Sequence, residues 1–183
     1  ITFLTQCSKV ELTPFQQDWK IYKQYFLNSG RIIDTANQNI SHSESQGYGM
    51  LFAVYADDSD QFNKIWGWTK NTLQRPDHLF SWKYVTSENG QCEKTCIPDP
   101  NNATDGDILI AWALYLAAEK WDNQNYYKQA NTISEAIKSK LIRKKFGYYL
   151  LLPGEFGFES PDNRIQINLS YWVFPALQKF SEV

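Results

Sequence analysis

The chain has 183 residues, of which 43% are hydrophobic, and its formal net charge is -2. That length and apolar content suffice for one domain, residues 1–183, with a sizeable core. The nearly balanced charge argues against a nucleic-acid partner, and no apolar run reaches the roughly 18 residues needed to cross a bilayer.

The hydrophobic periodicity is helical and predicts an all-α fold. Thr13 is a natural N-cap for the first helix, Pro14 suits its first position, and Gly30 follows its end. A short strand is expected at 148–152, before Pro153-Gly154. The helices are expected at 14–27, 43–56, 59–73, 105–121, 125–141 and 168–180, the last kinked or interrupted at Pro175.

These helices alternate in kind along the chain. The first, third and fifth are amphipathic, whereas the second and fourth are apolar nearly all round, which is typical of buried helices. Such alternation predicts helical hairpins arranged in two concentric rings. The N-termini of the inner helices then meet at one end, and polar clusters stand there: Ser43-Glu44, Thr104-Asp105-Gly106-Asp107 and Asn168-Leu169-Ser170-Tyr171. They are either a site or ordinary helix starts, which favour such residues.

Glu44 has two interpretations. With Ser41 it has the spacing of a capping box, Ser-x-x-Glu. Gly47 and Gly49, however, each cost about 1 kcal/mol inside a helix, which the close approach of a ligand or of another backbone would explain. A carboxyl at the start of a buried helix also suits an acid that stays protonated, provided that burial or a second carboxylate outweighs the helix dipole. Asp105 is the natural second carboxylate.

The cluster around Asp105 is likewise either a cap or a site. Thr104 can cap the helix, and acids in the first turn suit the dipole. Carboxylates also bind sugar hydroxyls well, since charge-assisted hydrogen bonds are about twice as strong as neutral ones. The aromatic content of 16% mostly reflects core packing, although some rings at helix ends would suit stacking on sugars.

Metal and nucleic-acid sites are not indicated. Cys92 and Cys96 form either a small disulfide loop or two free thiols, and a zinc site would lack ligands because the chain has only two histidines. His42 fits a loop or supporting residue better than a metal ligand. The basic run Arg143-Lys144-Lys145 reads as the solvated end of a helix.

Several motifs, in this order, resemble glycoside hydrolase family 8. They are Gly30-Arg31-Ile32-Ile33-Asp34, Ser43-Glu44-Ser45-Gln46-Gly47-Tyr48-Gly49-Met50, Ser81-Trp82-Lys83, Ala103-Thr104-Asp105-Gly106-Asp107, Leu151-Leu152-Pro153-Gly154 and Asn168-Leu169-Ser170-Tyr171. The resemblance is strongest to periplasmic members from bacterial cellulose-synthesis operons. It implies an (α/α)6 barrel, inverting cleavage of β-1,4-glucan, no metal or other cofactor, periplasmic or secreted localisation, and association with a cellulose-synthesis complex.

The resemblance also implies roles for individual residues. Glu44 matches the general acid, and Asp105 matches the carboxylate that holds the sugar at the cleavage subsite. Trp82 matches a stacking residue, Tyr171 the tyrosine near the attacking water, and Tyr48 is expected to bind substrate. This chain departs from the family in two places: Ser45 stands where Gly is usual, and Leu169 stands where Pro is usual.

The general base of the family lies in an Asp-Ala-x-Arg motif, which does not occur before Val183. Three predicted hairpins are half of six. We therefore expect the N-terminal portion of a family 8 catalytic domain, an incomplete barrel that is inactive alone. Its inner helices should expose a long apolar flank, covered by the missing C-terminal half or by a dimer.

Three rival interpretations stay open. The chain could belong to a glucan-binding protein that has lost catalysis, or to a family member that acts on chitosan, xylan or mixed-linkage glucan. It could also be an unrelated helical interaction protein whose helix starts imitate a site.

Overall fold

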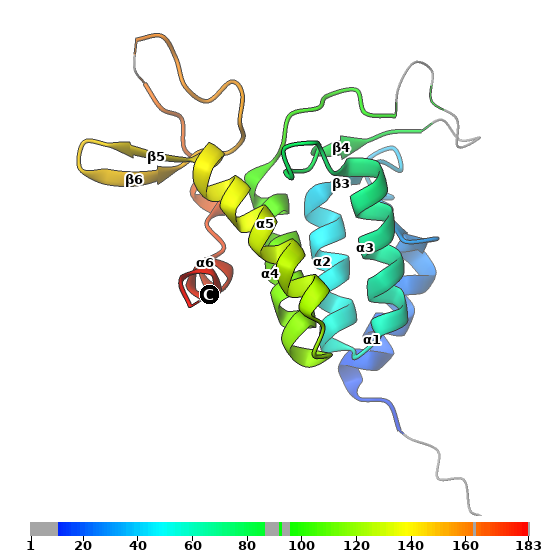
Figure 1. Cartoon of the computed structure of the whole chain (residues 1–183). Coiled ribbons are helices and arrows are strands. Elements are labelled where there is room, and N and C mark those ends of the chain that lie inside the picture. The colour runs from blue at the N-terminus through cyan, green and yellow to red at the C-terminus, as the bar shows by residue number, and fades with distance from the viewer. Residues whose placement is uncertain (1–10, 87–91, 93–95, 163, 183) are drawn as a thin grey trace, which may run out of the picture.

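The computed structural model describes residues 11–86, 92, 96–162 and 164–182. This part of the chain is mostly helical, as predicted (Figure 1). Its helices are α1 (Pro14–Phe26), α2 (Ser43–Tyr55), α3 (Ser59–Leu73), α4 (Thr104–Lys120), α5 (Gln124–Leu141) and α6 (Phe174–Ser181). Its strands are β1 (Leu27–Asn28), β2 (Arg31–Ile32), β3 (Ser41–His42), β4 (Lys83–Tyr84), β5 (Ile142–Lys145) and β6 (Tyr148–Leu151).

The first five helices begin and end within one residue of the predicted positions, but the sixth does not. Residues 168–180 form a short 3-10 turn, Leu169–Tyr171, and then a separate helix, α6, that starts at Phe174. Pro175 lies in the first turn of α6, where its missing N–H is not needed. The proline therefore starts the helix instead of kinking it.

The buried helices α2 and α4 form the centre of the fold. They pack against each other, with α3 beside α2, and α5 and α6 beside α4 (Figure 1). The amphipathic helix α1 covers α2 through aromatic contacts, in which Trp19 and Tyr22 meet the ring of Phe52 edge-on. The predicted alternation of buried and amphipathic helices is thus found for α1 to α5.

Glycines set the distance between α2 and its neighbours. A Cβ atom added at Gly47 would lie 2.5 Å from the Cβ of Leu109 in α4, and one at Gly49 would lie 2.7 Å from the side chain of Ile32. Real Cβ atoms do not approach other atoms so closely. The two helical glycines are therefore explained by the close approach of protein atoms.

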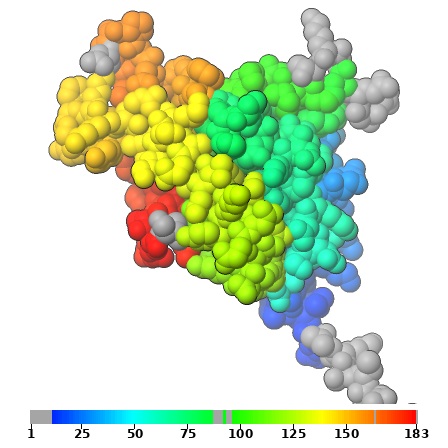
Figure 2. All heavy atoms as spheres, in the orientation of Figure 1, coloured from blue at the N-terminus to red at the C-terminus, as the bar shows by residue number. Residues whose placement is uncertain are grey.

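The strands form short antiparallel pairs at the ends of the helices. In the pair β3–β4, His42 lies opposite Lys83, directly before α2 begins. The β5–β6 hairpin projects from the helical body, with the loop that follows it (yellow to orange in Figures 1 and 2). Cys92 and Cys96, between β4 and α4, form a disulfide, which selects one of the two predicted alternatives.

The exposed apolar flank predicted for the inner helices is narrower than expected. On α4 the hydrophobic side chains are buried except for the half-buried Trp112 and Leu116, because α2, α5 and α6 enclose the helix. Exposed rings on α2 are limited to Tyr48 and Tyr55. The predicted sixth inner helix is the real exception: α6 buries only Ala176, and Phe174 in its first turn is 68% exposed.

No helix within the described residues is long and apolar enough to pass through a membrane.

Candidate active site

Helix α2 starts with an unexpected cap. The predicted capping box between Ser41 and Glu44 is not formed, because Ser41 is occupied elsewhere: its hydroxyl accepts a hydrogen bond from Arg31 Nε at 2.8 Å and donates one to the carbonyl of Ile32. The N-cap is instead His42, whose Nδ1 accepts the backbone N–H of Ser45 at 3.1 Å. Glu44 is therefore not used as a cap and remains half-buried in the first turn.

Helix α4 starts without a side-chain cap. Its N-cap is Ala103, and the hydroxyl of Thr104, predicted to cap, instead donates to the carbonyl of Leu152 at 2.6 Å. Asp105 follows in the first turn, and its Oδ1 accepts the backbone N–H of Gly106 at 2.8 Å. Both helices thus place an acidic residue that is not a cap in their first turn.

The starts of α2 and α4 touch each other. A Cβ atom added at Gly106 would lie 2.1 Å from Ser43 Oγ and 2.8 Å from the backbone nitrogen of Glu44. Glu44 and Asp105 are therefore carried by two helix ends in direct contact. Burial, and secondly the negative charge of Glu44, raise the pKa of Asp105 to about 6, although the Gly106 N–H partly opposes this.

Two tyrosines join these carboxyls. Burial raises the pKa of Tyr48, and the charges of Glu44 and Asp105 add to the effect. The pKa of Tyr171, in the 3-10 turn before α6, is raised by burial and by the same two carboxylates. The polar clusters at the starts of three segments, far apart in sequence, thus meet at one end of the helices.

Trp82 reaches this end through its backbone. Its carbonyl accepts the N–H of Ser43 at 3.0 Å, and its N–H donates to the carbonyl of Asn101 at 2.9 Å. Its indole Nε1 donates to Asp99 at 2.8 Å, and the ammonium of Lys83 lies 5.4 Å from the ring centre. The half-buried ring is therefore held in place next to the start of α2.

Asp107, which the sequence placed in a polar cluster that was either a cap or a site, is a buried structural acid. It is fully buried, and its oxygens accept the backbone N–H of Phe80 at 2.8 Å and the amide of Asn102 at 2.6 Å. Burial raises its pKa to about 8 against the opposing effect of these hydrogen bonds. The sequence contained one signal for this burial. An acidic residue in a helix that is apolar on all sides must face the core.

The carboxylates of Asp34 and Glu44 lie close to the ring of His42. Its Nε2 lies 3.5 Å from Asp34 Oδ2, and its Nδ1 lies 3.8 Å from Glu44 Oε2. The sequence placed His42 only as a loop or supporting residue. Its proximity to Asp34 could not be read from the chain, because the two residues meet through the turn that joins β2 to β3.

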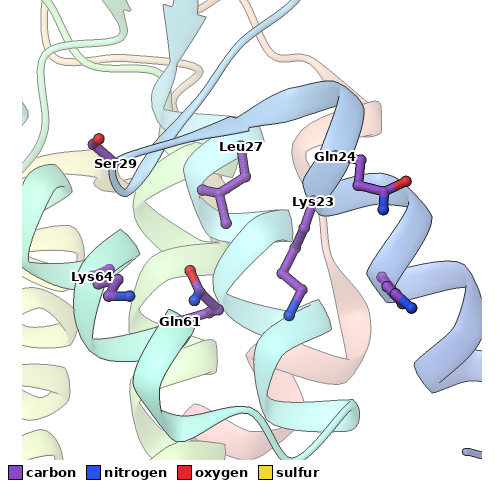
Figure 3. A pocket seen from close by; sticks show the side chains of 7 residues that line it. Lys23, Gln24, Leu27, Ser29, Gln61 and Lys64 are labelled. Carbon is purple, nitrogen blue, oxygen red and sulfur yellow. The ribbon is translucent and has the colours of Figure 1, made fainter.

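A hollow of about 660 Å³ lies elsewhere, between α1 and α3 (Figure 3). Lysine and glutamine side chains dominate its lining, and it contains none of the predicted site residues. Its lining consists of Lys20, Lys23, Gln24, Leu27, Ser29, Gln61 and Lys64. Over the described residues, histidine, cysteine and acidic side chains form no group of three or more that could hold a metal ion.

Comparison with known proteins extends these observations. The family model described as "Glycosyl hydrolases family 8" matches residues 3–183. An endoglucanase of Cellulomonas uda is 40% identical over 169 residues, which are 91% of this chain and 45% of that protein. This chain spans about half the length of the curated relatives it matches.

Solved structures agree with the family match. The endo-β-1,4-glucanase CMCax of Acetobacter xylinum superposes with a TM-score of 0.85 at 39% identity, over 92% of this chain and 51% of that one. Endoglucanase Cel10 of Klebsiella pneumoniae, a family 8 glycosyl hydrolase, gives a TM-score of 0.84 at 39% identity, over 91% and 52%. The helical fold is therefore that of family 8 structures over about half of their length.

Proposed function

The chain belongs to glycosyl hydrolase family 8, and from that premise we propose that it is the part of an inverting endo-β-1,4-glucanase that carries the general acid. In this proposal Glu44 protonates the glycosidic oxygen as the leaving sugar departs. The proposal rests on the family membership together with the convergence of acidic and aromatic side chains at the start of α2.

Each of the other site residues has a role in binding the substrate. Asp105 accepts hydrogen bonds from sugar hydroxyls at the cleavage subsite, and Trp82 stacks on a sugar ring. In this proposal Tyr171 stands by the attacking water, and Tyr48 contacts the substrate from the exposed side of α2.

The observation that carries the proposal is the contact between the helix ends that carry Glu44 and Asp105. A methyl group at Gly106 would stand 2.8 Å from the backbone nitrogen of Glu44, and the charge of Glu44 contributes to the raised pKa of Asp105. Glu44 is thus presented beside a carboxyl suited to binding sugar hydroxyls, as an acid that acts at the cleaved bond requires. No role as a helix cap competes for Glu44.

We propose that residues outside these 183 supply the general base, because this chain spans about half the length of its relatives. Inverting enzymes keep the two catalytic carboxyls about 6.5–9.5 Å apart, with the attacking water between them. We propose that this chain supplies three of the six hairpins of an (α/α)6 barrel and that further residues of the same gene product supply the base. A second copy of the chain could supply the base only if it placed an acidic residue near the starts of α2 and α4.

The substrate and location follow the same premise. The relatives named above are endoglucanases, one of them described as an endo-β-1,4-glucanase, so we propose β-1,4-glucan as substrate. We also propose a periplasmic or secreted bacterial protein, which acts beside a cellulose-synthesis complex. The Cys92–Cys96 disulfide supports an oxidising compartment.

The test is Glu44→Gln in the full-length gene product, with reducing-sugar release from carboxymethylcellulose as readout. We expect at least about a hundredfold loss of turnover, the usual contribution of a general acid, with cello-oligosaccharide binding retained. Glu135→Gln is the matched control, since Glu135 is exposed on α5 and contacts only Lys138 at 3.5 Å among the ion pairs described.

Near-normal turnover by the Glu44→Gln variant would refute the assignment. Binding without hydrolysis by the unmodified full-length protein would instead favour the glucan-binding alternative. The 183-residue chain alone should release no reducing sugar, and measurable release would contradict the proposed origin of the base.

A further inference from the structure

Helix α2 begins with an imidazole, where serine, threonine, aspartate or asparagine is usual. The contact is reciprocal. His42 Nδ1 accepts the N–H of Ser45 at 3.1 Å, while the Ser45 hydroxyl accepts the N–H of His42 at 3.3 Å and donates to the His42 carbonyl at 2.7 Å. His42 and Ser45 therefore lock the first turn of α2, the turn that carries Glu44.

The cap fixes the position of the proton on the imidazole. A ring nitrogen that accepts a backbone N–H carries a lone pair and no hydrogen, so the hydrogen of the neutral ring is on Nε2. That nitrogen faces Asp34 Oδ2 at 3.5 Å. The other oxygen of Asp34 accepts the N–H of Ala36 at 3.1 Å, which holds the carboxylate in place. Asp34 thus favours the tautomer that the cap requires.

This arrangement also places the ring next to Glu44. Glu44 Oε2 lies 3.8 Å from His42 Nδ1. The lone pair of Nδ1 is already used by the N–H of Ser45, so the ring meets the carboxyl in van der Waals contact and limits where the Glu44 side chain can turn. The charged groups that the structure places near the ring are Asp34 and Glu44, with Lys83 opposite His42 on β4. The ammonium of Lys83 is turned over the ring of Trp82.

We infer that His42, held by Asp34, is a positioning residue that orients Glu44 for proton donation. This inference rests on the proposed function, in which Glu44 is the general acid. Ser45 takes part in the same arrangement. It stands where the family usually has glycine, and its hydroxyl makes the reciprocal hydrogen bonds with the backbone of His42.

The test compares two substrates in the full-length gene product. A dinitrophenyl β-cellobioside releases a stable anion and needs little help from an acid, whereas a phenyl β-cellobioside needs a proton on its leaving oxygen. The informative variant is His42→Asn, because asparagine retains an N-cap acceptor but lacks the ring nitrogen that faces Asp34. Asp34→Asn removes the carboxylate and leaves the ring.

For His42→Asn we expect kcat to fall roughly tenfold or more on the phenyl substrate and less than about twofold on the dinitrophenyl substrate. Asp34→Asn should show the same selectivity with a smaller loss. His78→Asn is the matched control: His78 is exposed in the turn after α3, and its φ of +74° suits asparagine. It should change neither rate.

Equal losses on both substrates, or no loss on either, would overturn the inference, since a merely structural role does not distinguish leaving groups. Thermal melts of each variant report folding separately. Glu44→Gln is measured in parallel: if it lacks the selectivity, the proposed function itself fails. If Glu44→Gln shows the selectivity and His42→Asn does not, only the role of His42 fails.

Discussion

Gly106 of α4 lies against Ser43 of α2 so closely that a methyl group at Gly106 would stand 2.1 Å from the Ser43 hydroxyl oxygen. The neighbouring contact, 2.8 Å to the backbone nitrogen of Glu44, involves main-chain atoms that cannot rotate away. The spacing of the two acidic helix starts therefore depends on the absence of a side chain at this one position.

Gly106→Ala should force the two helix starts apart. We expect the free energy of unfolding to fall by about 1–3 kcal/mol, the usual cost of overpacking, although alanine favours a helix by about 1 kcal/mol. Denaturant melts measure the change. Gly67→Ala in α3 is the control, because a Cβ there meets nothing within 4 Å. It should leave stability unchanged or raise it by up to about 1 kcal/mol. Equal destabilisation by both variants would contradict the packing argument.

Asp105→Asn should make the protein more stable at neutral pH. The pKa of Asp105 is raised from 3.8 to about 6, so between these pH values the folded protein binds more protons than the unfolded chain. The contribution of this carboxyl to the free energy of unfolding therefore has its full value below about pH 4 and is lost as the pH rises to about 6. We expect the variant to exceed the wild type by about 1–3 kcal/mol at pH 7 and to match it at pH 3.5. Melting curves at both values test this, and a constant difference would count against it.

Asp107→Ala should destabilise the fold strongly. It leaves the N–H of Phe80 and the amide of Asn102 buried without their acceptor, at about 1–3 kcal/mol for each group. Asp107→Asn keeps one acceptor oxygen and should cost about half as much. Chemical denaturation of both variants gives the ranking, and an alanine variant as stable as the wild type would show that the network is dispensable.

Reduction of the Cys92–Cys96 disulfide should have a small effect on stability. The two residues are only four positions apart, so the bond removes little freedom from the unfolded chain, about 2 kcal/mol in the chain-entropy model. The double Cys→Ser variant should melt about 4–8 °C below the wild type. Loss of the folded state on reduction would show that the disulfide contributes more to stability than the chain-entropy model gives.

The sequence predicted the helices well because their periodicity and caps are local signals. The positions of α1, α3 and α5 follow from apolar spacing, and the burial of α2 and α4 follows from surfaces without a polar face. Pro175 was recognised as an interruption, but its place in a first turn was not. A proline ends one helix or begins the next, and only the surrounding packing decides between these outcomes.

The site was predicted as a set of residues, but its internal contacts were not. The meeting of Glu44 and Asp105 could be argued from consecutive antiparallel helices, which place the N-termini of the inner helices at one end. The use of His42 instead of Ser41 as the N-cap could not be predicted. It depends on the hydrogen bonds that the Ser41 hydroxyl makes with Arg31 and Ile32 across the β2–β3 turn. The burial of Asp107 between two loops is likewise a tertiary property with only a weak trace in the sequence.

The contacts at Gly47 and Gly106 also have a mechanical consequence. They press α2 and α4 together at two points along their length, one near the start of the helices and one a turn further along. If one helix slid past the other, the side chain of Leu109 or Ser43 would collide with backbone atoms. The starts of α2 and α4, which carry Glu44 and Asp105, therefore behave as one rigid unit. If the proposed function holds, adjustment to a sugar chain comes from rotation of side chains and from the segments that carry Trp82 and Tyr171, while the starts of α2 and α4 stay in place.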